Sequence, residues 1–225
     1  MKHAALIAYL EGAANELTDR VLAEMYRDPF WHARFGDRAD RHGRQDGLFH
    51  IKYLVSALAA DDRNVMVEYA RWLRTLLASH GMCTRHLDDN FALLASEIGR
   101  GGGPPERDEA MTLLSAARDA LRYPLGPAQR VQDLTPEIRE RVASALAAPD
   151  WPVEQCADQL STLLSYLADA IALDNPAQFR AHVTWTGDFL EQRGIARAWL
   201  AAGLAALRKE LAAELRPEQL AALFD

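Results

Sequence analysis

The chain has 225 residues, of which 49% are apolar and 25% are charged, and its formal net charge is -7. This is an ordinary globular composition, and a chain of this length buries about 70% of its unfolded surface without needing disulfides or a structural metal. Disordered, collagen-like and disulfide-stapled proteins are therefore excluded, and the negative charge argues against binding to nucleic acid.

Apolar residues recur at spacings of three and four along the chain, which predicts an all-α protein. The predicted helices cover about 3–27, 37–60, 63–80, 84–98, 106–122, 153–173, 176–193 and 196–215, with further helices starting at 135 and 216. An aromatic segment containing Phe30, Trp31 and Phe35 separates the first two. We expect Gly43 and Gly47 to fray or kink the second helix, because each costs ~1 kcal/mol in a helix interior.

Proline and glycine mark the remaining breaks. Thr135 and Pro136 form an N-cap and first-turn pair, and Trp151 lies between two prolines. The clearest boundary is the stretch 99–105, four glycines and an arginine ended by two prolines, which is typical of a linker. We therefore expect an N-terminal helical half, 1–100, and a C-terminal helical half, 104–225.

The two halves share an internal repeat. Residues 53–98 align without gaps onto 166–211 at an offset of 113, and 12 of the 46 pairs are identical. Asp61 and Asp174 occupy matching turns between helices, where a short acidic side chain can cap the next helix. Gly81 and Gly194 follow the second helix of each copy, where a positive φ is expected. We interpret the fold as two similar three-helix units, produced by duplication and packed as one helical bundle. The alternative is that two unrelated three-helix units use common turn residues.

A second set of matching positions is aromatic. Trp72 and Trp185 lie nine residues before the glycines, where we expect them to fill the core between helices. Spacing of three places Tyr69 on the same helix face as Trp72, and His182 on the same face as Trp185. The functional interpretation is an aromatic-lined cavity between the halves, and the alternative is plain core packing. The candidate ligand-binding residues are His50, Tyr53, Tyr69, Trp72, Tyr166, His182 and Trp185.

Signatures of catalysis are missing from the sequence. The glycine stretch lacks the lysine and strand context of a phosphate-binding loop, and there is no H-E-x-x-H or E-x-x-H pair for a metal centre. We assign no catalytic residue and no metal ligand, and expect a protein that is not an enzyme. The cofactor is unknown. An imidazole in the cavity could ligate haem, and cobalamin is a second possibility.

Cysteine usage and hydropathy suggest a location. Cys83 and Cys156 are far apart and form no C-x-x-C pair, which fits reduced thiols in the cytoplasm. No run approaches 18 apolar residues, so we expect no membrane span.

Two segments resemble known families. The turns Leu173-Asp174-Asn175-Pro176 and Gln192-Arg193-Gly194-Ile195 resemble the helical cap of bacterial cobalamin-binding modules. The segments Met25–Pro29 and Arg34-Phe35-Gly36 resemble non-catalytic globin-related sensor domains. The D-x-H-x-x-G motif of the cobalamin family is absent and no proximal histidine of a globin is assignable, so no functional residue is carried over.

These observations favour a regulatory or sensory helical protein that binds a partner protein or a small apolar ligand. The alternatives are a haem- or tetrapyrrole-binding protein, and a structural module that forms homodimers, for which closed twofold symmetry is the default expectation.

Overall fold

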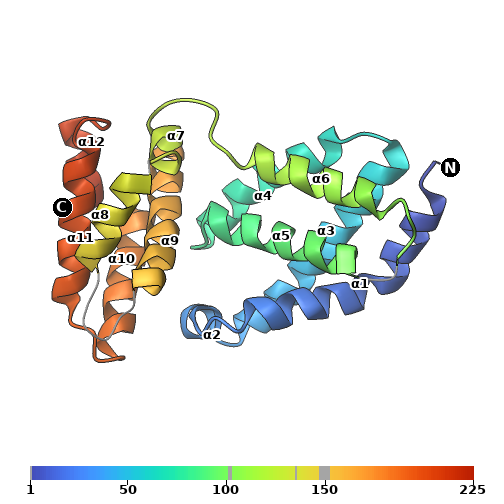
Figure 1. Cartoon of the computed structure of the whole chain (residues 1–225), viewed down its shortest axis with the longest axis horizontal. Coiled ribbons are helices and arrows are strands. Elements are labelled where there is room, and N and C mark those ends of the chain that lie inside the picture. Colours follow the sequence, from blue (N-terminus) through green and yellow to red (C-terminus); the bar gives the residue numbers. More distant parts are fainter. Residues whose placement is uncertain (1, 101–102, 135, 147–152) are drawn as a thin grey trace. The chain divides into compact units, whose positions relative to one another are not determined.

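The protein is all-helical, as predicted (Figure 1). The structure is a computed structural model and describes residues 2–100, 103–134, 136–146 and 153–225, in which no strand occurs. The expected cap at Thr135 and the break around Trp151 lie outside the described residues, as does part of the 99–105 stretch. The helices are α1 (Ala4–Met25), α2 (Phe30–Phe35), α3 (Arg38–Ala60), α4 (Asn64–Ser79), α5 (Thr84–Arg100), α6 (Arg107–Ala120), α7 (Pro127–Gln132), α8 (Pro136–Leu146), α9 (Val153–Ala172), α10 (Pro176–Glu191), α11 (Arg197–Leu211) and α12 (Pro217–Phe224).

The chain forms two compact units. The first comprises Met1–Arg74 and His86–Leu121, and the second comprises Thr75–Arg85 and Arg122–Asp225. Helix α6 thus belongs to the first unit although it follows the glycine stretch, while the connection between α4 and α5 belongs to the second.

In the first unit α1 packs along α3. Helices α2 and α6 also pack against α3. The expected fraying does not occur, because α3 runs unbroken through Gly43 and Gly47. A Cβ at Gly43 would collide with the Tyr26 hydroxyl, and one at Gly47 would collide with Thr18. Tyr26 in turn donates to the carbonyl of Ala39 at 2.6 Å. The two glycines therefore let α1 approach α3 closely, and this packing outweighs their poor helix propensity.

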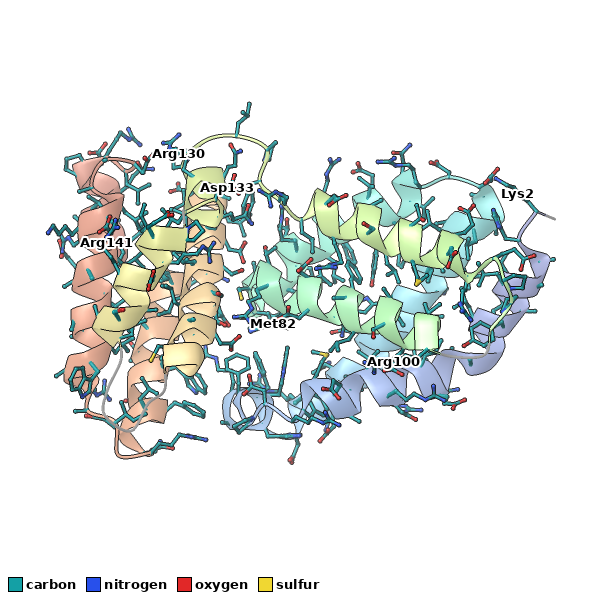
Figure 2. The ribbon with its side chains drawn as sticks, in the orientation of Figure 1. Lys2, Met82, Arg100, Arg130, Asp133 and Arg141 are labelled. Atoms are coloured by element: carbon teal, nitrogen blue, oxygen red, sulfur yellow. The ribbon has the colours of Figure 1, made fainter. Side chains whose placement is uncertain are left out.

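In the second unit α9 is the central helix and packs against α7, α8 and α10, while α11 packs on α8 and α12. Gly203 of α11 lies so close to α8 that a Cβ there would overlap Leu146. Arg141 of α8, labelled in Figure 2, donates to Glu210 of α11 at 2.8 and 3.0 Å on the surface. The short helix α7 was not predicted; Gly126, with φ 91°, precedes its first-turn proline.

Four helix ends share one geometry. Asp61 and Asp174 are left-handed, with φ of 51° and 50°, and Gly81 and Gly194 have φ of 82° and 79°. Behind each, the next amide reaches back five residues to a carbonyl: Asp62 to Ala57, Asn175 to Ala170, Met82 to Leu77 and Ile195 to Leu190, at 2.8–3.1 Å. This is the Schellman cap, which satisfies carbonyls that the helix leaves open. The positive φ expected at both glycines is confirmed.

Candidate functional site

The first group of candidate residues lies in the first unit, where α3 supplies His50 and Tyr53 and α4 supplies Tyr69 and Trp72. The rings of Tyr53 and Tyr69 are stacked, with centroids 3.8 Å apart and an interplanar angle of 13°. His50 Nδ1 lies 2.8 Å from the Tyr69 hydroxyl, and the Trp72 ring is 6.1 Å from that of Tyr69. The structure therefore brings these four predicted residues together.

The buried members of this group are uncharged. Burial lowers the pKa of His50 to about 3 and raises the pKa of Tyr69 above its usual range. A neutral imidazole and a neutral phenol can share one hydrogen bond in an apolar core without the cost of burying a charge. His50 also contacts Phe91 edge to face, at 5.1 Å between centroids. Its surroundings are those of a satisfied core histidine.

The outer members of the group form an exposed aromatic surface. Trp72 is 56% exposed, Phe49 is 42% exposed and Tyr53 is 36% exposed. The expectation that Trp72 fills the core is therefore wrong. Phe49 and Tyr53 are one helical turn apart on α3, and Trp72 lies beyond Tyr69 on α4. We call Phe49, Tyr53 and Trp72 the α3–α4 face.

The second group lies in the second unit, where α9 supplies Tyr166 and α10 supplies His182 and Trp185. Tyr166 and His182 are stacked at 3.7 Å with an interplanar angle of 12°, and the His182 and Trp185 rings are 6.3 Å apart. Here the stacked pair is fully buried, and Trp185 is half-buried against Phe189 at 4.8 Å.

A short corner of the chain covers this second group. Residues Gly81–Arg85, the α4–α5 corner, belong to the same unit, and Figure 2 labels Met82 in it. The Tyr166 hydroxyl donates to the Gly81 carbonyl at 2.7 Å, and the Gln178 amide donates to the Met82 carbonyl at 2.9 Å. The face formed by α9 and α10 thus binds backbone carbonyls of a polypeptide corner.

Asp169 of α9 fixes the other end of this corner. Its carboxylate is buried and accepts the Thr84 amide at 2.7 Å, the Thr84 hydroxyl at 2.5 Å and the Tyr123 hydroxyl at 2.7 Å. It therefore caps the start of α5 from a distant helix. The sequence analysis missed Asp169. The available signal was an acidic residue next to Ala168 and Ala170 on a predicted helix whose neighbouring positions are apolar.

Several expectations about ligands stay predictions, including the cavity between the halves and the binding of haem or cobalamin. Among the described residues, no group of three or more His, Cys, Asp or Glu side chains could hold a metal ion. His182 lies flat on Tyr166, with Nε2 3.4 Å from the Thr186 hydroxyl, so packing and a local contact define its position. No helix in the described ranges is long and apolar enough to cross a membrane.

Comparison with protein-family models, with curated proteins and with solved structures found no significant match for this chain.

Proposed function

We propose that this chain is a non-enzymatic regulatory or sensory protein that binds a partner protein through the α3–α4 face. The observation that carries the proposal is the exposure of Phe49, Tyr53 and Trp72 on a packed aromatic support. The support is the stacked Tyr53–Tyr69 pair. The buried His50 is hydrogen-bonded to the Tyr69 hydroxyl on the core side of this pair. Clustered exposed aromatic side chains are typical of protein interfaces, where tryptophan and tyrosine contribute most of the binding energy.

We propose further that the two helical halves, 1–100 and 104–225, arose by internal duplication. Identical turn residues support this, and so do the matching Schellman caps at Asp61 and Asp174 and at Gly81 and Gly194. The stacked pairs support it as well. Tyr53 and Tyr69 are related by the offset of 113 to Tyr166 and His182, and both pairs stack at nearly the same distance and angle.

The duplication favours a polypeptide over a small ligand as the occupant of the α3–α4 face. The matching face of the second unit is covered by a turn between helices, whose backbone carbonyls accept from Tyr166 and Gln178. Tyr53 is the counterpart of Tyr166 and presents the same hydroxyl on an exposed ring. The proposed partner therefore offers a helix–turn–helix corner.

Charge and thiols support the rest of the proposal. The net charge of -7 argues for a protein partner over nucleic acid. Cys83 and Cys156 are buried and are not joined by a disulfide, which supports placing the protein in a reducing compartment such as the cytoplasm.

Site-specific photo-cross-linking in cells of the source organism tests the proposal. The photoreactive residue p-benzoylphenylalanine replaces Trp72 and, as a control, the exposed Glu11 of α1. We expect a covalent protein adduct from position 72, identified by mass spectrometry, which the additional change Phe49→Ala reduces severalfold. If position 72 gives no more adduct than position 11, the proposal is refuted.

A thermal-shift assay with haem, cobalamin and fatty acids tests the small-ligand alternative on the same face. We expect no change in melting temperature with any of them. A saturable increase that Trp72→Ala abolishes would assign the α3–α4 face to a small ligand and contradict a protein partner.

A further inference from the structure

The two proposed repeats differ in which of their surfaces is covered. In the second repeat the α9–α10 face is covered, since Tyr166 and His182 are fully buried, whereas the counterpart α3–α4 face of the first repeat is exposed. The corners show the opposite pattern. In the α4–α5 corner Cys83 and Thr84 are buried, whereas the corner at the same place in the second repeat is largely exposed. We call these residues, Gly194–Ala198, the α10–α11 corner. One face and one corner of the chain thus remain exposed.

The exposed face and the exposed corner, taken together as the exposed pair, retain the residues of one contact. In the covered pair, that contact joins the α9–α10 face to the α4–α5 corner. In the covered pair the Tyr166 hydroxyl donates to the Gly81 carbonyl at 2.7 Å. At the offset of 113, Tyr53 replaces Tyr166 and Gly194 replaces Gly81, so donor and acceptor residue types are unchanged. The backbone geometry of the acceptor is also unchanged, since φ is 82° at Gly81 and 79° at Gly194. The α3–α4 face therefore keeps the donor of this hydrogen bond, and the α10–α11 corner keeps its acceptor.

One surrounding polar contact is replaced by apolar residues on both sides, whereas the Asp169–Thr84 contact is replaced by Ser56 and Arg197. In the covered pair Arg85 donates to the Thr162 hydroxyl at 2.9 Å and pairs with Asp158. The counterpart of Arg85 in the exposed corner is Ala198, and the counterpart of Thr162 on the exposed face is Phe49. Both partners of a polar contact are thus apolar in the exposed pair, so neither would leave a buried polar group without a partner.

We propose that the α10–α11 corner of one copy docks on the α3–α4 face of a second copy of this chain. This inference rests on the proposed function and names its partner. The interface would repeat between molecules the contact that the α4–α5 corner makes with α9 and α10 inside one molecule. The contact joins two different surfaces, and in a closed twofold dimer it occurs twice, once for the face of each copy.

Sedimentation velocity of the purified full chain tests the proposal, over concentrations from roughly 1 to 300 µM, the range of weak to moderate interfaces. We expect a concentration-dependent dimer. Trp72→Ala on the face and Ala198→Glu on the corner should each weaken it roughly tenfold or more, as for residues at the centre of an interface. Two controls should leave it unchanged: Leu125→Ala, which removes an 83% exposed side chain elsewhere, and Ala205→Glu, on the exposed side of the same helix two turns from the corner. Circular dichroism and the melting temperature check that each variant is folded.

Mixing the two variants tests whether the face of one copy contacts the corner of the other. The Trp72→Ala chain keeps an intact corner and the Ala198→Glu chain keeps an intact face, so an equimolar mixture should recover association through one interface per pair. A dimer in which face packs on face would be broken by Trp72→Ala and unaffected by Ala198→Glu, and that result would overturn the proposal.

A strictly monomeric wild-type chain would also overturn it. The proposed function would then stand if the photo-cross-link at position 72 identifies a different protein, and would fall with it if that position gives no adduct.

Discussion

The buried carboxylate of Asp169 offers a direct test of how the α4–α5 corner is held. Asp169→Ala removes the acceptor of three donors, the amide and hydroxyl of Thr84 and the hydroxyl of Tyr123. A buried donor left without a partner costs ~1–3 kcal/mol, although hydroxyls can turn to other acceptors. The backbone amide has no such freedom. We therefore expect a loss of about 3–5 kcal/mol in the free energy of unfolding.

Two comparison variants separate this effect from general damage to α9. Asp169→Asn keeps an oxygen for the Thr84 amide and turns its NH2 toward the two hydroxyls, which can accept, so the loss should be only about 1–2 kcal/mol. Asp158→Ala removes a 62% exposed carboxylate on the same helix that pairs with Arg85, and exposed ion pairs are worth under ~1 kcal/mol. Urea unfolding followed by circular dichroism measures all three. A loss below about 1 kcal/mol for Asp169→Ala would refute the capping role.

Three further predictions concern glycines and a histidine. Gly203→Ala should lower the free energy of unfolding by about 1–3 kcal/mol, measured by urea unfolding. The overlap with the buried Leu146 side chain outweighs the ~1 kcal/mol gain in helix propensity. An increase in stability would show that α8 shifts freely. Gly126→Ala should cost about 1–3 kcal/mol through backbone strain alone, because φ is 91° and a Cβ there meets no atom within 4 Å; unchanged stability would contradict that conformation. His50 has a folded-state pKa lowered to about 3, so its contribution to stability is fully present above the unfolded pKa of ~6.5 and declines as the pH falls toward 3. Its ring NMR signals should not titrate between pH 8 and 5, and a midpoint near 6.5 would show that the ring is solvated.

The sequence predicted the fold class and the helix ends because both depend on local chemistry. Gly81 and Gly194 were recognisable as helix ends, since glycine adopts a positive φ without steric cost. The packing around individual residues was harder to predict. Gly43 and Gly47 suggested a kink because propensity is a local quantity, whereas the close approach of α1 depends on a helix distant in sequence. Trp72 suggested core for the same reason, as helical spacing gives the face but not what covers it.

The candidate residues divide in the same way. Spacing correctly placed Tyr69 beside Trp72 and His182 beside Trp185, because residues three apart share a helix face. Asp169 could not be identified as a cap from the sequence, since its partners Thr84 and Tyr123 lie 85 and 46 residues away along the chain.

The path of the backbone between the two units has a practical consequence. The chain passes from one unit to the other after Arg74, after Arg85 and after Leu121, so the units are interleaved along the polypeptide. Severing it at the glycine stretch would deprive the amino-terminal fragment of α6 and strip the carboxy-terminal fragment of the residues that shield Tyr166. Neither fragment would contain all of its packing partners. Biochemical experiments should therefore use the full chain and not either fragment.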